Sequence, residues 1–435
     1  MSLKNLILRL SGRKTNFLKA VIGIVFVIIV LALILVLPHY FSAHQSRIHP
    51  IATLNPPNIS HKTVTPVTSN SSPTNSAPTS NTKQLKSDSN PKTIVQNSAL
   101  PPSTIDNNKP TTTSTTLLPE FFGSIDTMKD SRDTDYPLSQ QMTGTEIGQE
   151  VNLIVSQNAN YITDDAFYDY PTYLTLWANT IHAAGKHVWF RPHFNCWEMD
   201  NGCTTQMTPG EYLSSLSDFI NNDYKIFKTG DIFDPCSEPE DSNYWQTTYG
   251  NNWSWQNAPN SGTDAYNAFM IDVSQTAQTA LQQNGVYGVI TNIRSTNSWW
   301  PQNPDSLYPS TIKTLGYITY DSYPEGTTTD PATAAATRVS ELNAIILDNP
   351  GVPIILGEFG YSNDVNVDDA TQAAVLNAEI NAISSYSQIV GLNYWVGAGG
   401  PGYGGYTNIF TGTSGNWLAR PGSAVIAKYF SEKIN

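Results

Sequence analysis

Two glutamates in this sequence could do chemistry together. Glu238 lies in the string SEPE, and Glu358 lies in the string LGEFG. Each follows an apolar run, IF before Glu238 and VPIIL before Glu358, so each charge ends a buried element where water or a ligand can reach it. Two facing carboxyl groups can cleave an acetal, because one protonates the departing oxygen while the other attacks or activates water.

Residues 119–435 alternate strand-like and helix-like segments. The strand candidates are short, apolar on both faces and rich in β-branched or aromatic residues, as expected of strands buried from both sides. They are 121–126, 160–162, 187–192, 230–234, 287–293, 316–321, 353–359 and 389–396. Eight such units predict a (β/α)8 TIM barrel, which typically takes about 250 residues plus insertions. A doubly wound sheet is the alternative, but no glycine-rich phosphate loop follows the first strand.

Helix signals lie between the strands. Thr208 to Glu211 forms a capping box with proline at the first helical position, and Asp330-Pro331 starts another helix. In a barrel of this kind the site lies where strands end and βα loops begin. Glu238 follows the fourth predicted strand and Glu358 ends the seventh, so we expect both to project into one bowl.

These motifs resemble glycoside hydrolase clan A, and within it family 5, which includes cellulases and mannanases. The resemblance covers the whole barrel domain and rests on a few short motifs. Glu238-Pro239 matches the clan's acid/base after strand four, and Glu358 matches its nucleophile at the end of strand seven. Clan members usually have asparagine before the acid, where it binds the sugar's 2-hydroxyl; here the residue is Ser237, and Glu240 is an alternative acid.

The resemblance also implies contacts around this pair. Tyr323, in DSYP after strand six, resembles the tyrosine that hydrogen-bonds the nucleophile, and Trp395 resembles the tryptophan that floors the sugar site. Arg191, in FRPH, corresponds to the clan's arginine near the nucleophile, although that residue usually comes from strand two. If the two carboxyl groups lie about 5–5.5 Å apart, the mechanism is retaining.

Further substrate contacts are predicted from aromatic residues in the loops. All ten tryptophans lie in the barrel domain, and Trp197 and Trp299 follow the third and fifth predicted strands. Pyranose rings stack on indoles, so we expect a polysaccharide substrate, with about half of the tryptophans covering the barrel end as a secondary core. His193 either binds a sugar hydroxyl or packs at the rim.

The cysteines and histidines form no metal-binding pattern, and we predict neither a metal nor a cofactor. In an oxidising exterior, Cys196 could pair with Cys203 or with Cys236. The sequence does not decide between these pairings.

The N-terminal part of the chain has a different composition. Residues 20–37 form an unbroken apolar run, preceded by Lys and Arg without an acid. We therefore predict a cytoplasmic segment at 1–19, a transmembrane signal-anchor at 20–38 and an extracellular remainder. A cleaved signal peptide, which would give a secreted protein, is the alternative. The composition of residues 39–118 predicts a disordered linker, because 43 of the 64 residues in 53–116 are Ser, Thr, Pro or Asn and bury too little apolar surface to fold.

Charge and composition restrict the partners. Residues 119–435 carry 12 Lys or Arg and 34 Asp or Glu, a net charge of −22, against +9 for residues 1–118. So acidic a domain repels phosphate backbones, which argues against a nucleic-acid partner. We expect a monomeric, membrane-anchored, endo-acting glycosidase that cleaves a β-linked polysaccharide. The competing hypothesis is a tethered glycan-binding barrel without catalysis, since Ser237 replaces the asparagine.

Overall fold

The computed structural model describes most of the chain after residue 120. The described ranges are 121–132, 141–199, 203–297, 303–326, 328–361, 367–399, 407–412 and 416–434. The predicted cytoplasmic segment, signal-anchor and linker lie outside these residues and stay predictions. Within the described part, no helix combines the length and hydrophobicity needed to cross a bilayer.

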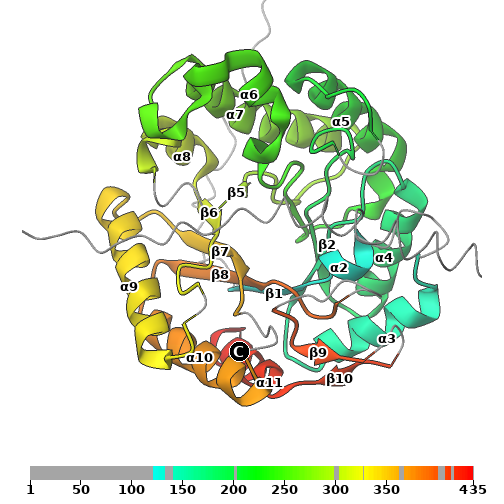
Figure 1. Cartoon of the computed structure of the whole chain (residues 1–435). Coiled ribbons are helices and arrows are strands. Elements are labelled where there is room, and N and C mark those ends of the chain that lie inside the picture. The colour runs from blue at the N-terminus through cyan, green and yellow to red at the C-terminus, as the bar shows by residue number, and fades with distance from the viewer. Residues whose placement is uncertain are drawn as a thin grey trace, which may run out of the picture. The chain divides into compact units, whose positions relative to one another are not determined.

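Eight parallel strands form one curled sheet in a TIM-barrel-like α/β fold (Figure 1). Their order is β4-β3-β2-β1-β8-β7-β6-β5, which is cyclic in sequence, unlike the order of a doubly wound sheet. A parallel bridge between Ile232 and Ile290 joins β4 to the segment that leads into β5. The strands are β1 (Phe122–Asp126), β2 (Tyr161–Asp164), β3 (His187–Phe190), β4 (Ile232–Phe233), β5 (Ser295–Thr296), β6 (Ile318–Asp321), β7 (Ile354–Phe359) and β8 (Ile389–Tyr394).

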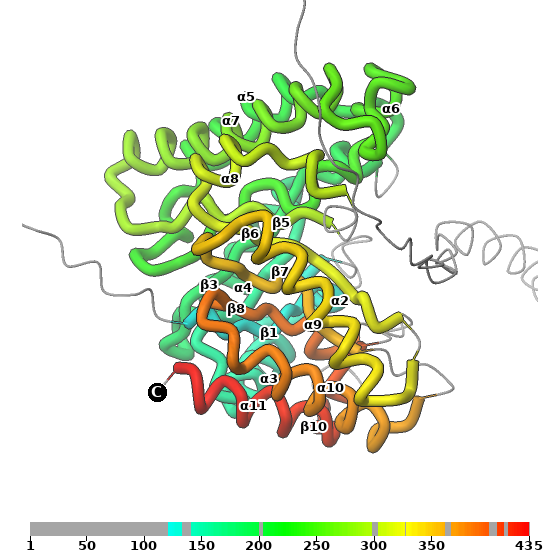
Figure 2. The backbone as a smooth tube through the Cα atoms, turned by 90° about the vertical axis from the view of Figure 1, so that its left-hand side faces the viewer, coloured from blue at the N-terminus to red at the C-terminus, as the bar shows by residue number. Residues whose placement is uncertain are grey.

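The helices surround this sheet (Figure 1). They are α2 (Met128–Ser131), α3 (Gly144–Val155), α4 (Pro171–Ala183), α5 (Pro209–Asp223), α6 (Asn243–Tyr249), α7 (Ser261–Gln283), α8 (Pro309–Leu315), α9 (Pro331–Asp348), α10 (Asp369–Ile383) and α11 (Pro421–Ile434). A small hairpin of β9 (Phe410–Thr411) and β10 (Leu418–Ala419) follows β8. The long α7 packs beside the short α8, on the side of the sheet formed by β5 and β6 (Figure 2).

Local sequence signals explain how several helices begin. Thr208 accepts a hydrogen bond from the Glu211 N–H while the Glu211 carboxylate accepts one from the Thr208 N–H, so the predicted capping box is confirmed. The Asp330 carboxylate accepts a hydrogen bond from the Thr333 N–H, so α9 begins at Pro331, as the Asp330-Pro331 pair predicted. These contacts satisfy backbone donors that the first turn of a helix leaves without partners.

The barrel interior consists of an apolar layer followed by a polar layer. Phe122, Tyr161, Trp189, Ile232, Ile293 and Ile355 form a buried cluster near the starts of the strands. Because side chains alternate along a strand, the residue two positions further on faces the same way. These positions are Ser124, Thr163, Arg191, Asp234, Ser295 and Gly357. The polar layer lies near the carboxyl ends of the strands, where it can support charged side chains.

The fifth predicted strand is wrong in its bounds. Residues 287–293 were expected to form it, but the strand is Ser295–Thr296, and only Ile290 bridges to β4. Gly288, at φ +78°, interrupts the extended backbone at the start of the predicted segment. Asn292 donates its side-chain amide to the Leu315 carbonyl at the end of α8, which anchors this segment by a side chain.

Candidate active site

The two predicted glutamates lie close together at the carboxyl ends of the strands. Glu358 belongs to β7 and is 9% exposed, and Glu238 lies in the loop after β4. One carboxylate oxygen from each of Glu238, Asp321 and Glu358 lies within 4.8 Å of the other two. The expectation that both glutamates share one bowl is therefore met, with Asp321 of β6 as a third member.

Glu238 is held by an unusual turn of the backbone. It has φ 42° and ψ 53°, in the left-handed region that residues other than glycine rarely adopt. Its N–H donates to the Ser295 carbonyl of β5 at 3.2 Å, and Pro239 then starts a short 3-10 turn over Pro239–Asp241. The Trp245 indole donates to the Pro239 carbonyl at 2.7 Å. Such strain persists where surrounding contacts impose it, and it is common at functional sites.

Glu358 receives two strong donors. Arg191, directly after β3, donates through Nη2 to Glu358 Oε1 at 3.2 Å. The Tyr323 hydroxyl, from the loop after β6, donates to Oε2 at 2.9 Å. Both side chains thus contact Glu358, as the resemblance implied, and both donors favour the ionised form of Glu358.

Arg191 is itself fixed by the polar layer of the barrel. Its Nη1 donates to Asp126 Oδ2 at 3.2 Å and to the Gly357 carbonyl at 3.3 Å, and its Nη2 donates to Asp321 Oδ2 at 2.8 Å. The Asn393 amide of β8 bonds the same Asp126 oxygen and the same Gly357 carbonyl. The guanidinium is therefore held by acceptors on β1, β6 and β7, and Asn393 of β8 fixes two of these acceptors.

The two glutamates have different environments. Burial and the neighbouring Glu358 carboxylate raise the pKa of Glu238 well above its ordinary value. Burial also raises the pKa of Glu358, but Arg191 and the Tyr323 hydroxyl oppose that effect. The donors at Glu358 thus favour its ionised form more than any contact does at Glu238, and such a difference can separate the roles of two carboxyl groups.

The alternative acid, Glu240, points elsewhere. Its carboxylate accepts hydrogen bonds from the Asn297 N–H and from the Tyr266 hydroxyl of α7. Burial raises its pKa to about 7, while these donors oppose the shift. Its contacts tie the loop after β4 to α7 and to the segment after β5, so Glu238, rather than Glu240, is the carboxyl group that lies beside Glu358.

Two of the predicted aromatic contacts lie beside the nucleophile candidate. The rings of Tyr323 and Trp395 are 5.9 Å apart, nearly edge to face, and both are partly buried. The Trp395 indole N–H points to the Met128 sulfur at 2.9 Å, and the Lys129 ammonium lies 5.4 Å from the ring centre. A partly exposed indole next to a carboxylate pair can support a pyranose ring.

Other predicted contacts are corrected by the structure. Ser237 is buried and donates its hydroxyl to the Arg191 carbonyl at 3.1 Å, so it supports the Arg191 backbone and presents no free hydroxyl to a sugar. His193 is fully buried, 5.0 Å from the Phe167 ring and 3.6 Å from a Glu198 oxygen, which matches the packed alternative. Trp299 lies outside the described residues.

Trp197 was predicted to contact substrate, and this prediction is wrong. Its side chain is fully buried, and its ring stacks on Phe269 at 5.0 Å and packs against Tyr212 and Trp245. A sugar cannot reach an indole enclosed in this way. Trp245 and Trp253 are also buried, stacked at 5.2 Å, so this part of the tryptophan set forms the secondary core between α5, α6 and α7.

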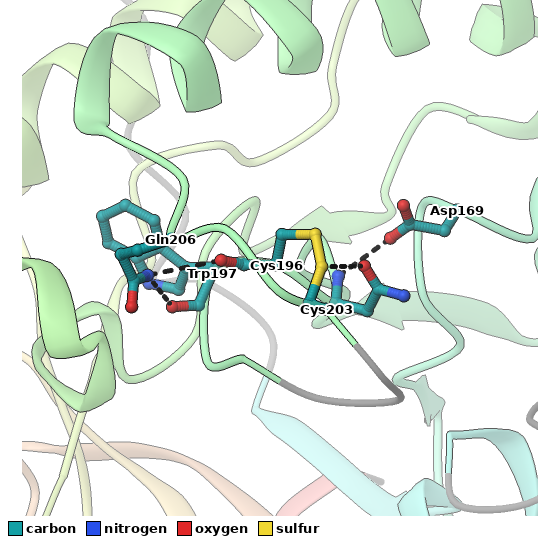
Figure 3. Close-up of a disulfide and its surroundings, with 6 residues drawn as sticks. Asp169, Cys196, Trp197, Cys203 and Gln206 are labelled. Carbon is teal, nitrogen blue, oxygen red and sulfur yellow. Dashed lines mark hydrogen bonds between the residues drawn. A yellow bond between two sulfur atoms is a disulfide. The ribbon is translucent and has the colours of Figure 1, made fainter.

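The structure settles the cysteine pairing. Cys196 and Cys203 form a disulfide, and Cys236 is free and buried. Figure 3 shows the Gln206 amide donating to the Cys196 and Trp197 carbonyls beside this bridge, at 3.3 Å and 2.7 Å. The disulfide and Gln206 thereby fix the loop that follows β3, next to the strand end that carries Arg191.

Sequence reasoning missed three members of the site. Asp126, Asp321 and Asn393 were not predicted, although each is a polar residue at or near the end of a predicted strand. Their position after apolar runs was the same signal that identified Glu238 and Glu358. A carboxylate trio can ligate a divalent cation, but here Arg191 already provides the counter-charge to two of the three.

Comparisons with known proteins give limited information. No family model matches this chain, and no curated protein matches it. Among solved structures it is similar to β-glucuronidase from Ruminococcus gnavus in complex with D-glucuronic acid, with 14% identity, a TM-score of 0.48, and 72% of this chain and 49% of that chain covered. A second structure of Ruminococcus gnavus β-glucuronidase gives 14% identity, a TM-score of 0.49, and coverage of 72% and 51%. The chain thus spans about half the length of these proteins, and similarity at this level carries no functional argument.

Proposed function

We propose that this protein is a glycoside hydrolase that cleaves a β-linked polysaccharide with retention of anomeric configuration. Glu358 is the nucleophile and Glu238 is the acid/base. The observation that carries the proposal is the carboxyl pair itself, with oxygens within 4.8 Å and two donors directed at one member. Oxygens within 4.8 Å of each other are closer to the separation of about 5–5.5 Å in retaining enzymes than to the about 6.5–9.5 Å at which inverting enzymes admit a water.

The geometry suits a double displacement. In the first step Glu358 attacks the anomeric carbon while Glu238 gives its proton to the departing glycosidic oxygen, leaving a glycosyl ester on Glu358. In the second step Glu238, now ionised, takes a proton from water as that water attacks the same carbon and releases Glu358. Arg191 and Tyr323 hold the Glu358 carboxylate in place through both steps.

Substrate class follows from the surroundings of the pair. Trp395 and Tyr323 supply partly exposed aromatic surface next to Glu358, which suits a pyranose ring. We also propose endo action on a polymer, because the pair lies at the carboxyl ends of the strands, where the βα loops of such a barrel form the site. The competing proposal is a glycan-binding barrel without turnover, and it is favoured by Ser237, whose hydroxyl bonds backbone in place of a sugar.

The decisive experiment compares glutamine variants of the full-length chain on β-glucan, mannan and xylan oligosaccharides. For Glu358→Gln we expect turnover to fall by roughly three orders of magnitude or more, with binding retained, since the nucleophile is lost and the shape is kept. Proton NMR of the first product should show the β-anomer. A first-formed α-anomer would contradict retention, and binding without turnover by the unmodified protein would favour the glycan-binding barrel.

Matched variants separate the two acid candidates. Glu238→Gln should lose activity on substrates with poor leaving groups and keep more of it on aryl glycosides, because an activated leaving group needs no proton. Glu240→Gln should retain turnover on both substrate types, since its carboxylate faces Asn297 and Tyr266. The reverse pattern would assign the acid to Glu240.

A further inference from the structure

Asp321 is the third carboxyl of the cluster, and its place in the sheet puts it beside the nucleophile. It ends β6 and pairs in register with Glu358 of β7, just after an irregularity between Tyr320 and Asp321. It is 2% exposed. Arg191 Nη2 donates to Asp321 Oδ2 at 2.8 Å and to Glu358 Oε1 at 3.2 Å, so one nitrogen connects the two carboxyl groups.

The Asp321 carboxyl group occupies space that is free because residue 357 is a glycine. A Cβ at Gly357 would collide with Asp321 Oδ1 and would lie 2.8 Å from Ser295 Oγ. Neither of these two oxygens has a hydrogen-bond partner among the described residues, although both are buried. The second oxygen of Asp321 is therefore enclosed in the polar layer of the barrel, away from the guanidinium.

A count of charges limits how many of these groups can be ionised. Arg191 contacts Asp126, Asp321 and Glu358, and Glu238 lies within 4.8 Å of two of them. Several carboxylates around one buried guanidinium repel one another, so some must hold protons. The proposed mechanism requires Glu358 to be ionised and Glu238 to be protonated. Asp126 accepts hydrogen bonds from Arg191, Asn393 and the Met128 N–H, whereas one buried oxygen of Asp321 has no hydrogen-bond partner among the described residues. Asp321 is therefore the remaining carboxyl group with the least support for a negative charge.

We propose that Asp321 is a positioning residue that stays protonated while Glu358 is ionised, so that it holds Arg191 against the nucleophile without adding a third negative charge. This inference rests on the proposed function for the roles of the two glutamates. Burial and the Glu358 charge raise the pKa of Asp321 well above its ordinary value, and Arg191 opposes them. The charged or titratable groups that act on its charge are Arg191 after β3, Asp126 of β1 on the same guanidinium, Asp234 after β4, Glu238 and Glu240 in the following loop, and Glu358 on β7.

The test uses Asp321→Asn, which imitates the protonated acid, in the full-length chain. With 4-nitrophenyl β-cellobioside as the probe, we expect kcat/KM to fall by less than about tenfold and both limbs of its pH profile to stay within about 0.3 pH units of the wild type. If Asp321 is ionised in the wild type, the substitution removes a negative charge. Both limbs would then move to lower pH by about one unit or more, which would overturn the proposal. Asp321→Ala should lose far more activity, because Arg191 loses an acceptor.

A second measurement needs no substrate. Infrared spectroscopy of protein with carbon-13-labelled aspartate should show the carbonyl stretch of a protonated aspartic acid at neutral pH, and Asp321→Asn should remove one such band. Asp165→Asn is the control, because burial also raises the pKa of Asp165. Absence of any protonated aspartate, or a band lost only in the control, would overturn the proposal even if the probe is not cleaved. Failure to cleave any glycoside, with the Asp321 band present, would instead count against the proposed function.

Discussion

Tyr323 shows how one hydroxyl can set the properties of the site. Its donation to Glu358 Oε2 at 2.9 Å stabilises the carboxylate, while burial and the Glu358 charge raise the pKa of Tyr323 itself well above its ordinary value. The hydroxyl therefore remains a donor across the pH range in which a glycosidase works. Its contribution is electrostatic and can be removed without changing the shape of the ring.

Tyr323→Phe should lower kcat/KM by about 10- to 100-fold, the effect of losing a hydrogen bond to a charged group. Because the lost donor favoured the ionised form, the pKa of Glu358 should rise, and the acid limb of the pH profile should move to higher pH. Steady-state kinetics across pH would measure both effects. Tyr394→Phe is the matched control, since its buried hydroxyl donates to the Thr407 carbonyl. An acid limb that does not move would contradict this role.

Single residues also show what the sequence could predict about the site. Glu238 and Glu358 were identified because charged residues that follow apolar runs have few structural explanations, whereas Arg191 and Tyr323 were identified from the resemblance to clan A. The role of Trp197 could not be predicted, because a loop tryptophan gives the same sequence pattern whether it covers a cleft or fills a core. Only the packing of Tyr212, Trp245 and Phe269 around it, contributed by α5, α6 and α7, decides between these possibilities.

At the scale of elements, seven of the eight strands were predicted within a few residues, because buried parallel strands are continuous apolar runs. The fifth strand was misplaced. Only Ile290 in the apolar run 287–293 forms a β-bridge, and the strand itself, Ser295–Thr296, follows that run. The irregular registers between β6, β7 and β8 were also invisible in the sequence. They depend on how neighbouring strands fit together, yet they decide which residues of β7 face the site.

Glu240 links three elements and makes their packing sensitive to pH. It joins the turn after β4 to α7 and to the segment after β5. Its pKa rises from an ordinary value of 4.5 to about 7 in the folded protein. Between these values the folded protein keeps a proton that the unfolded chain has lost. The stability that Glu240 contributes is therefore complete below about pH 4.5 and is lost as pH rises through 7.

Glu240→Gln should remove this dependence. Relative to the wild type, the variant should gain stability progressively from pH 4.5 to pH 8, to about 3 kcal/mol at the upper end, at about 1.4 kcal/mol for each unit of pKa shift. Denaturant unfolding at several pH values measures the difference. Glu432→Gln, on the exposed face of α11, should show no such trend. A constant difference between variant and wild type at all pH values would mean that folding does not raise the pKa of Glu240.

At the scale of the whole molecule, the chain combines an acidic barrel with a basic, apolar start. The −22 charge of residues 119–435 disfavours nucleic acid, and we continue to expect a monomer with polysaccharide as its partner. An enzyme acting on a polymer that cannot enter the cell has to work outside it. The apolar run 20–37 and the Ser, Thr, Pro and Asn-rich segment that follows would supply an anchor and a spacer of about 50 Å in end-to-end distance.

This arrangement predicts where the activity will be found in cells that express the full chain. The protein should stay in the membrane fraction after an alkaline carbonate wash and should dissolve in detergent, because an 18-residue apolar helix spans about 27 Å.

Protease added to intact cells should cut within 39–118 and release an active domain, since a segment without a core is open to proteolysis. A lysine-free N-terminus, with Lys4, Lys14 and Lys19 changed to glutamine, should weaken this orientation. Full-length protein in the medium would indicate a cleaved signal peptide, and protease resistance of the domain in intact cells would contradict the extracellular orientation.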